Sequence, residues 1–479
     1  MTTVSHPELR ALFAGELSAM YGTEVPAYRT LVEVCEEINT EVLAARGDTA
    51  HRRGSIERVT AERHGAIRVG TPEELAQAAQ LFAGFGMFPV GFYDLRDAYP
   101  SPIPVVSTAF RPVDENELAR NPFRVFTSLL VPEDRRFFGE DLERRLREFL
   151  GERTLFSQEL IELARRSSAD GGLARDDVDR FVSMAVQCFA LSSDPVDRCW
   201  YEELEQVSSV AADIGGVRST HINHLTPRVL DIDQLYLRMQ DRGIEMIDKI
   251  QGPPRWEGPD VLLRQTSFRA LGEARRFLEP GGRVTDGHLR VRFGEVEARG
   301  IALTPTGLDR YDRLCRQLRS VPEEHAAVHD EVAADLWREL MPLHEHDLAM
   351  QDLAYFTFHV RPDAPADPPN SLRALLSGGW VHVEPIVYED FLPLSAAGIF
   401  SSNLTSDGRV DTSSDGVTRD KTWMEAVIGA TIHDPQSLYA RQRDRSVAAA
   451  AVQLGIDEIV FDLGAVQSPA ASPIASAVP

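Results

Sequence analysis

The chain of 479 residues contains few cysteines, few cations and no long apolar segment. Its four cysteines lie far apart and form no CxxC pair, which argues against a disulfide-stapled fold and against a cysteine-rich zinc site. Only 50 lysines and arginines oppose 74 aspartates and glutamates, so the formal net charge is −24. Because such a charge repels polyanions, we expect the protein to bind neither nucleic acid nor anionic membranes.

Apolar residues are spread along the chain rather than concentrated in one segment. No uncharged apolar run reaches the ~18 residues that a membrane-spanning helix needs. The N-terminal segment carries His6, Glu8, Arg10 and Glu16 where a secretory signal would be apolar. We therefore expect a cytoplasmic protein without a membrane span. Nothing in the sequence specifies an oligomeric state.

The order of periodic segments predicts an α+β protein with a repeated core. Apolar residues at three- and four-residue spacing predict helices, and short alternating or β-branched runs predict strands. The predicted parts are N-terminal helices at 1–60, a first βαβββ module at 61–131, a helical insert at 132–215, a second βαβββ module at 216–305, a helical and mixed C-terminal region at 306–466, and a disordered tail at 467–479.

Residue matches at equivalent places support an internal repeat. The first module opens with the strand RHGAIRVG and continues with a helix that Thr71 and Glu74 can cap. In the second module, strands are predicted at 244–252, 260–271 and 289–303, after an initial strand and helix. Three stretches correspond in the same order, namely His64–Arg68 with His224–Arg228, Ser107–Arg111 with Gln265–Arg269, and Arg124–Phe126 with Arg292–Gly294. We interpret the two modules as copies of one unit.

Pairing of the modules about a pseudo-twofold axis would bring His64 and His224 together, because they hold equivalent positions. The last predicted strand of the second module adds Glu295. Two imidazoles and one carboxylate are the ligand set of a non-haem Fe(II) site with open coordination positions. Two alternatives stay open: Glu297 shares a strand face with Glu295, and His221 competes with His224.

Two arginines are candidates for binding a substrate carboxylate. Arg68 lies four residues after His64, so on a strand it shares the face of that histidine. A guanidinium beside a metal can bind a carboxylate bidentately. Arg269 and its repeat partner Arg111 could serve a second carboxylate or a structural ion pair.

The remaining histidines and motifs carry weaker signals. His325 and His329 have a spacing that can hold zinc on a helix, but their acidic neighbours favour a solvated face. His344 and His346 are two residues apart and would diverge around a helix. No P-loop, dinucleotide fingerprint or GxSxG elbow stands in a suitable context, so no organic cofactor is expected.

Longer motifs resemble a known family. Paired βαβββ modules with His, His and Glu ligands look like the vicinal oxygen chelate superfamily. The segment FGEVEARG resembles the glutamate-containing last strand of 4-hydroxyphenylpyruvate dioxygenases, which favours Glu295 over Glu297. The segments ERHGAIRVGT, HINHLTPRVLDID, LLRQTSF and RFGEVEARGIALTP resemble the 2-oxoadipate dioxygenase/decarboxylase (2-hydroxyglutarate synthase) family, and the similarity runs from about residue 8 to about residue 460.

This resemblance implies a fold of two modules forming an open β-barrel, and an Fe(II)-dependent reaction. The reaction would convert 2-oxoadipate and O2 into D-2-hydroxyglutarate and two CO2, a step of lysine catabolism. The metal triad of the family falls on His64, His224 and Glu295, and its substrate-carboxylate arginine falls on Arg68. Further pocket residues fall in the segment FLPLS at 391–395, here with substrate-binding Leu394 and Ser395. The family has valine where this chain has Leu394, which bears on the chain length of the substrate.

Two other classes of function use the same scaffold. A metal-dependent isomerase, lyase or ring-cleaving dioxygenase would share the triad. A non-catalytic binding protein would keep the fold without binding a metal. The identity of the bound metal and the need for O2 distinguish these classes.

Overall fold

A computed structural model describes residues 3–46, 63–98, 102–290, 292–318, 326–392 and 416–464. The chain divides into two compact units. The first unit comprises Met1–Pro253, Leu263–Arg299 and Glu389–Leu438, and the second comprises Pro254–Leu262, Gly300–Tyr388 and Tyr439–Pro479. Within the described ranges, no helix is both long enough and apolar enough to cross a lipid bilayer. The predicted tail at 467–479 lies outside the described residues.

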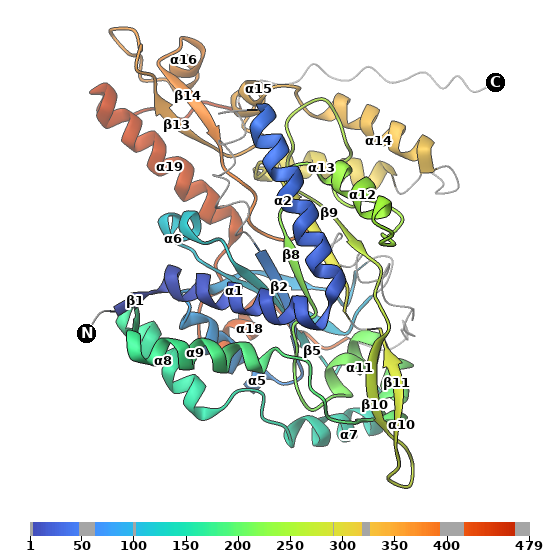
Figure 1. The fold of residues 1–479 in the computed structure, drawn as a ribbon. Coiled ribbons are helices and arrows are strands. Elements are labelled where there is room, and N and C mark those ends of the chain that lie inside the picture. The colour runs from blue at the N-terminus through green and yellow to red at the C-terminus, as the bar shows by residue number, and fades with distance from the viewer. Residues whose placement is uncertain are drawn as a thin grey trace, which may run out of the picture. The chain divides into compact units, whose positions relative to one another are not determined.

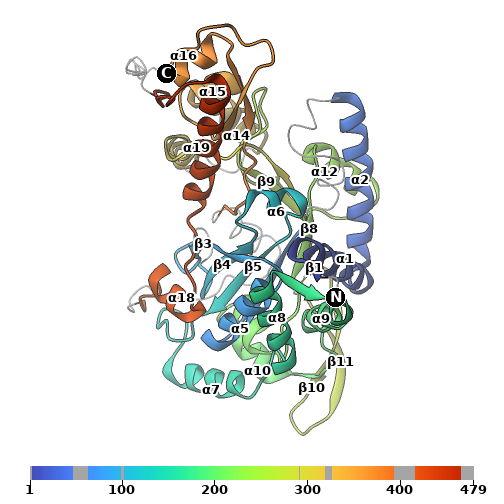
Figure 2. The same ribbon diagram turned by 90° about the vertical axis from the view of Figure 1, so that its left-hand side faces the viewer.

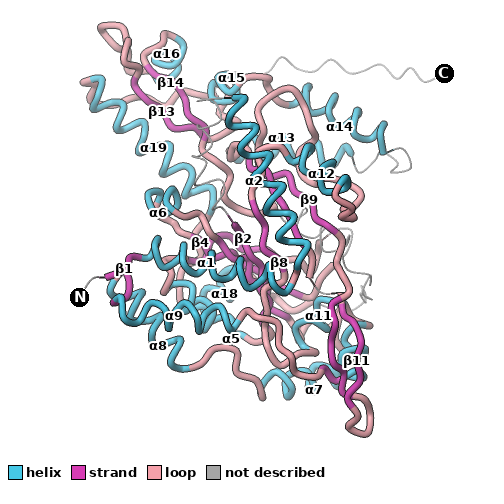
Figure 3. The backbone as a smooth tube through the Cα atoms, viewed as in Figure 1, coloured by secondary structure: helices cyan, strands magenta, loops and turns pink. Residues whose placement is uncertain are grey.

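The first unit contains most of the secondary structure (Figures 1 and 3). Its strands are β1 (Thr3–Ser5), β2 (Arg63–Val69), β3 (Phe88–Asp94), β4 (Val105–Arg111), β5 (Arg124–Leu130), β6 (Gly172–Ala174), β7 (Val196–Asp197), β8 (His224–Pro227), β9 (Leu263–Phe268), β10 (Glu273–Leu278), β11 (Val284–Leu289) and β12 (Gly294–Arg299). Its helices are α1 (His6–Glu24), α2 (Pro26–Arg46), α5 (Pro72–Ala83), α6 (Glu115–Arg120), α7 (Glu140–Gly151), α8 (Gln158–Asp170), α9 (Arg175–Cys188), α10 (Arg198–Glu205), α11 (Ser209–Gly215), α12 (Ile232–Asp241) and α18 (Lys421–Ile428).

A five-stranded sheet of order β3-β4-β5-β2-β8 organises this unit. β4 pairs antiparallel with β3 and β5, whereas β2 lies parallel to β5. β8 pairs antiparallel with β2 and forms the edge beyond it. Strands β2, β4 and β5 are buried along their whole length, as expected for strands covered on both faces.

Helix α5 connects β2 to β3, as the sequence predicted. The Thr71 hydroxyl accepts a hydrogen bond from the Glu74 backbone N–H at 3.1 Å, and the Glu74 carboxylate accepts one from the Thr71 N–H at 3.2 Å. Arg153 donates two further hydrogen bonds to that carboxylate, at 2.6 and 2.8 Å. α5 packs against α8, and α1 packs against α9 (Figure 2). The capping box thus fixes the direction in which the chain leaves β2.

The second repeat is less regular than the first. β9 and β12 pair antiparallel, and one bridge between Arg228 and Glu297 joins β12 in parallel to the end of β8. The strand predicted at 244–252 is reduced to two isolated bridges to β9. The strand predicted at 289–303 is confined to β12, and an unpredicted hairpin of β10 and β11 precedes it (Figure 1). The α+β class is confirmed, and the described strands form several small sheets, none of them a closed barrel.

The two faces of the five-stranded sheet carry separate apolar cores. One face includes Ile67 and Val125 and packs with residues of α1, α5, α8 and α9. The other includes Ala66 and Phe126 and packs with residues of α7, α10 and α11. Helices from the segment predicted as an insert therefore cover both faces. His64 lies on the face of Ala66, because alternate strand residues share a face.

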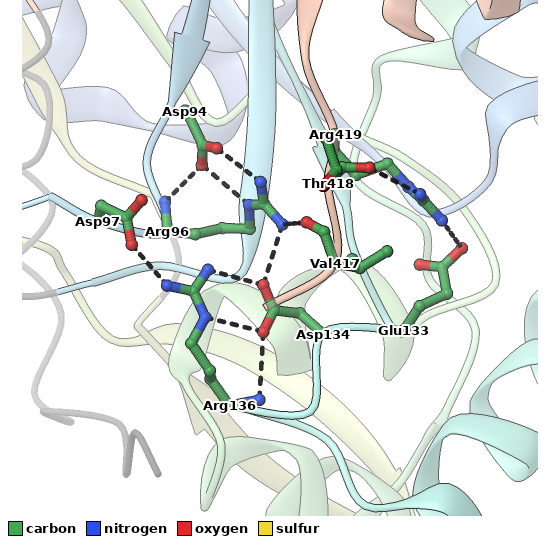
Figure 4. Close-up of polar contacts among 9 residues, drawn as sticks. All are labelled: Asp94, Arg96, Asp97, Glu133, Asp134, Arg136, Val417, Thr418 and Arg419. Carbon is green, nitrogen blue, oxygen red and sulfur yellow. Dashed lines mark hydrogen bonds and ion pairs between the residues drawn. The ribbon is translucent and has the colours of Figure 1, made fainter. Parts of the chain in front are cut away.

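An ion-pair network connects the segment before α18 to the loops after β3 and β5 (Figure 4). Asp134 is fully buried and accepts hydrogen bonds from Arg136 at 2.8 and 2.9 Å and from Arg96 at 3.0 Å. Arg96 also donates to the Asp94 carboxylate and to the backbone carbonyl of Val417. Burial alone would raise the pKa of Asp134, but Arg136 and Arg96 outweigh it and lower that pKa.

The second unit is built from helices and one small sheet. Trp337 is fully buried there, with Trp256 and Tyr311 packed edge-on against its ring at 6.0 Å. Its elements are α13 (Pro305–Leu318), α14 (Ala326–Leu340), α15 (Glu345–Met350), the antiparallel strands β13 (Phe356–Val360) and β14 (Val381–Pro385), and α16 (Leu372–Ser377). Helix α19 (Pro435–Leu454) begins in the first unit and continues in the second.

Candidate metal centre

Strand pairing brings His64 and His224 to one face of the sheet. In the antiparallel pair of β2 and β8, Ala66 lies opposite His224 and His64 lies opposite Thr226. The two histidines are therefore diagonal neighbours on the same face. β12 lies beside β8, because Glu297 forms a β-bridge with Arg228 at the end of β8. Glu295 is two residues before Glu297 on the same strand, so its side chain points to the same face.

The side chains of His64, His224 and Glu295 converge. Each offers one ligand atom, and these atoms lie within 4.8 Å of one another. Glu295 Oε2 is 3.4 Å from His64 Nε2, and Glu295 Oε1 is 3.6 Å from His224 Nε2. All three residues are buried. Among the residues that the structure describes, this is the one such group able to hold a metal ion, and its donor set suits a divalent transition metal.

Hydrogen bonding indicates which nitrogen of His224 faces the centre. The Thr226 hydroxyl lies 3.0 Å from His224 Nδ1 and donates to Glu295 Oε2 at 3.4 Å. A hydroxyl has one hydrogen and a carboxylate only accepts, so Nδ1–H of His224 must donate to Thr226. That tautomer leaves the lone pair on Nε2, on the side of Glu295.

Glu297 has a different environment from Glu295. It accepts hydrogen bonds from Arg299 at 2.7 and 2.8 Å and lies 3.6 Å from Arg124 Nη1. Its Oε2 is 3.0 Å from His64 Nδ1, on the opposite side of the ring from Nε2. Burial would raise the pKa of Glu297, but Arg299, His64 and Arg124 outweigh it and lower the pKa to about 2. This geometry favours Glu295 as the ligand.

The protonation of the triad follows from burial and neighbouring charges. Burial, reinforced by His64 and Arg68, lowers the pKa of His224 to about 4 although Glu295 opposes it. An imidazole with that pKa is neutral at pH 7 and can donate its lone pair to a metal. Burial would lower the pKa of His64, but the carboxylates of Glu297 and Glu295 outweigh it and raise the pKa of His64.

His221, the alternative to His224, belongs to a different cluster. Its Nε2 lies 3.4 Å from Asp213 Oδ1 and 3.2 Å from Asn223 Nδ2. Asp213 is buried and also accepts hydrogen bonds from Asn223 at 2.9 Å and from Arg68. Burial lowers the pKa of His221 to about 4. His221 therefore contacts Asp213, the ion-pair partner of Arg68, and is not one of the converging triad residues.

The structure places the other predicted site residues as follows. Arg68 is buried on β2, on the triad face, and pairs with Asp213. Arg269 directly follows β9 and pairs with Glu245 at 3.0 Å and Asp248 at 2.6 Å, so its role in substrate binding stays a prediction. Leu394, Ser395, His325 and the side chain of His329 lie outside the described residues, and His344 and His346 stand at the start of α15, away from any metal-binding group of the described chain.

The segment Glu389–Phe391 also contacts the site, and of these residues only Phe391 lay in the pocket segment predicted from the sequence. The Phe391 ring packs edge-on against His64, with centroids 4.9 Å apart. Arg111 donates to Asp390 at 2.9 and 3.1 Å, and Arg124 donates to Glu389 at 2.6 Å. These pairs fix Phe391 against the triad. Sequence reasoning missed them because the partners are more than two hundred residues apart.

Two glycines next to predicted ligands allow close packing. A Cβ at Gly65 would lie 2.6 Å from the Ile222 side chain, and one at Gly294 would lie 1.8 Å from the Phe268 ring. Either distance is far inside van der Waals contact. The glycines beside His64 and Glu295 therefore let these strands approach their neighbours.

Comparison with known proteins shows which family the chain resembles. A family model described as 2-oxoadipate dioxygenase/decarboxylase matches residues 13–403. The chain is 56% identical over 432 residues to the 2-oxoadipate dioxygenase/decarboxylase of Mycobacterium tuberculosis, which covers 90% of this chain and 95% of that protein. It is 40% identical over 471 residues to the protein of the same name from Pseudomonas putida, covering 95% and 98%.

A solved structure extends the similarity to three dimensions. The crystal structure of hydroxyglutarate synthase from Pseudomonas putida in complex with 2-oxoadipate matches with a TM-score of 0.82 and 39% identity, covering 95% of this chain and 99% of that one. The similarity in sequence and structure spans nearly all of both chains. The chain therefore belongs to the 2-oxoadipate dioxygenase/decarboxylase family.

Proposed function

We propose that this protein is an Fe(II)-dependent dioxygenase/decarboxylase that converts 2-oxoadipate and O2 into D-2-hydroxyglutarate and CO2, as a cytoplasmic step of lysine catabolism. The observation that carries the proposal is the convergence of His64, His224 and Glu295. It is supported by the similarity to an enzyme crystallised with 2-oxoadipate. Carbon balance corrects one expectation: a six-carbon acid that yields a five-carbon product releases one CO2, not two.

The residues of the triad fit the proposed metal. Two imidazole nitrogens and one carboxylate would hold Fe(II) and leave coordination positions for the 2-oxo acid. When bound, the iron would supply a Lewis acid for the keto acid and a centre that activates O2, while the net electrons that reduce O2 come from the oxidative decarboxylation of the substrate. The protein's own contribution is to hold the three side chains in place through strand register, Thr226 and Glu297.

Arg68 is proposed to bind a carboxylate of the substrate. It lies on the triad face of β2, and its charge acts on His224. Asp213 holds one side of the guanidinium, which orients the remaining N–H groups. Arg269, Leu394 and Ser395 are proposed to complete substrate binding.

Aromatic rings are proposed to exclude water from the reacting groups. Phe391 packs against His64, and Phe293 stacks on His224 with centroids 5.4 Å apart. Both phenylalanines are buried. A dry environment strengthens the electrostatic contacts to a small anionic substrate.

The arrangement of the predicted modules supports a paired architecture. In the first module β5 lies parallel to β2, and β12 has the same relation to β8. β4 pairs antiparallel with β5, as β9 does with β12. We propose that the two modules together form an open barrel. The six-part division of the chain also stays a prediction.

The test is an oxygen-consumption assay on anaerobically purified, full-length protein loaded with Fe(II). Addition of 2-oxoadipate and O2 should consume O2 and release 2-hydroxyglutarate and CO2 in equal amounts. His64→Ala, His224→Ala or Glu295→Ala should each abolish retention of iron, while His346→Ala, at an exposed histidine of α15, should retain it.

Three outcomes would contradict the proposal. The absence of O2 uptake and of 2-hydroxyglutarate would exclude the reaction. Unchanged iron content in one triad variant would remove that residue from the ligand set. Turnover with zinc or nickel in the absence of O2 would favour a lyase or an isomerase on the same scaffold.

A further inference from the structure

The first unit contains a cavity whose lining residues do not include the triad. The cavity has a volume of about 220 Å³ and opens between the segments before α10 and β8 and the strand β10. Its apolar walls are Phe149, Val196, Trp200 and Leu278. Arg275 and the buried His221 also line it. The cavity thus combines apolar walls with one buried cation.

Arg275 has an unusual environment for a buried arginine. Its exposed fraction is 8%, and its one hydrogen bond among the described residues goes from Nη1 to the Ser192 carbonyl at 2.6 Å. No carboxylate of the described chain lies within 4.0 Å of it, and Nε has no partner there. The nearby Glu273 is engaged by Arg292, which donates to both of its oxygens.

This arrangement leaves the buried charge of Arg275 without a carboxylate at ion-pair distance among the described residues, although Glu273 and Asp213 act on it from farther away. Buried arginines are almost always paired, because removing a charge from water is costly. Burial lowers the pKa of Arg275, and Arg292 adds to the effect, although Glu273 and Asp213 oppose it. An anion in the cavity would offset that cost and satisfy the N–H groups.

The surroundings indicate which anion fits. The flat guanidinium matches a carboxylate, and the apolar walls fit a short methylene chain. Asp194 and Asp197 are exposed at the rim, and Asp197 accepts a hydrogen bond from the Trp200 N–H. Inorganic phosphate has no methylene chain to cover the apolar walls, so it fits this cavity less well than an aliphatic carboxylate does. Arg218, also at the rim, pairs with Glu152 at 3.1 Å.

We infer that this cavity is a binding site for a small aliphatic carboxylate, held by the guanidinium of Arg275 and by the apolar side chains of Trp200 and Leu278. The site is close to the proposed substrate arginine, because His221 contacts Asp213, which pairs with Arg68. It does not depend on the metal chemistry, so its failure and that of the proposed function are distinguishable.

The experiment is calorimetric titration of the full-length, metal-loaded protein with glutarate, which lacks the 2-oxo group. Arg275→Gln should raise the Kd at least about tenfold, since it removes a charge-assisted contact. Arg276→Gln is the matched control, because Arg276 is exposed on the same strand and also donates to a backbone carbonyl, that of Ser193. That control should bind glutarate as the wild type does.

A second variant keeps the test valid if Arg275→Gln misfolds. Leu278→Glu places a negative charge on the partly exposed wall and should weaken glutarate binding by a similar factor. Inorganic phosphate should bind more weakly than glutarate. No glutarate binding to the wild type up to about 10 mM, equal affinity in Arg275→Gln and Arg276→Gln, or tighter binding of phosphate would overturn the inference.

Discussion

Replacement of Thr226 by valine should weaken metal binding without disturbing the fold. Thr226 is fully buried, and valine has nearly its shape. The substitution removes the hydroxyl that lies 3.0 Å from His224 Nδ1 and 3.4 Å from Glu295 Oε2. The Nδ1–H of His224 would then lack its partner in a buried site.

The expected loss follows from the tautomer of His224. Without Thr226, the imidazole proton can occupy Nε2, which lies 3.6 Å from Glu295 Oε1. A metal then binds only after that proton has moved or left. Loss of such a partner typically lowers metal affinity about 10- to 100-fold, which corresponds to about 1.4–2.8 kcal/mol.

The assay is competition of the metal-free, full-length protein with a fluorescent chelator for Fe(II) under anaerobic conditions. Thr226→Ser retains the hydroxyl and should bind the metal nearly as the wild type does. Thr127→Val is a matched control, because Thr127 is a fully buried threonine on β5 whose hydroxyl has no hydrogen-bond partner among the described residues. Wild-type affinity in Thr226→Val, or an equal loss in Thr127→Val, would refute the reasoning.

Three further substitutions test other parts of the structure. Arg68→Ala should raise the KM for 2-oxoadipate about tenfold or more, through loss of a carboxylate contact; an unchanged KM in steady-state assays would contradict that role. Asp134→Asn should lower the free energy of unfolding in urea by about 3 kcal/mol, because it leaves two arginines without their shared buried partner. Since those arginines lower the pKa of Asp134, its stabilisation should be present above the ordinary carboxyl pKa and be lost as the pH falls through the lowered value. Gly294→Ala should lower the Tm, at a cost of about 1–3 kcal/mol for overpacking, and a variant as stable as the wild type would show that the neighbouring ring can move.

The sequence was sufficient for the parts of the fold that depend on local patterns. The capping box of α5 and the strands β2, β4 and β5 were visible in short stretches of sequence. The hairpin of β10 and β11 was missed, although its EPGGR turn was a local signal. The prediction of a strand at 244–252 was wrong, because this segment pairs with β9 only through isolated bridges.

The candidate site was predictable where the repeat supplied long-range information. Equivalent positions in two modules pointed to His64 and His224, and the structure brings them together with Glu295. Thr226 was not found, because its role depends on which strand lies beside β8. The sequence also did not show that Arg275 has no carboxylate at ion-pair distance among the described residues, since this depends on Arg292 binding Glu273.

The balance of buried charge gives an independent reason to prefer Glu295 over Glu297 as the metal ligand. Glu297 is paired with Arg299, and no arginine of the described chain lies within ion-pair distance of Glu295. The contacts of the buried Glu295 carboxylate with the described residues are those to the two histidines and to the Thr226 hydroxyl, and none of them is to an arginine or a lysine. Because a buried charge needs a counter-charge, a divalent cation between those histidines would supply what the chain does not. The same reasoning, with the sign reversed, assigns an anion to Arg275.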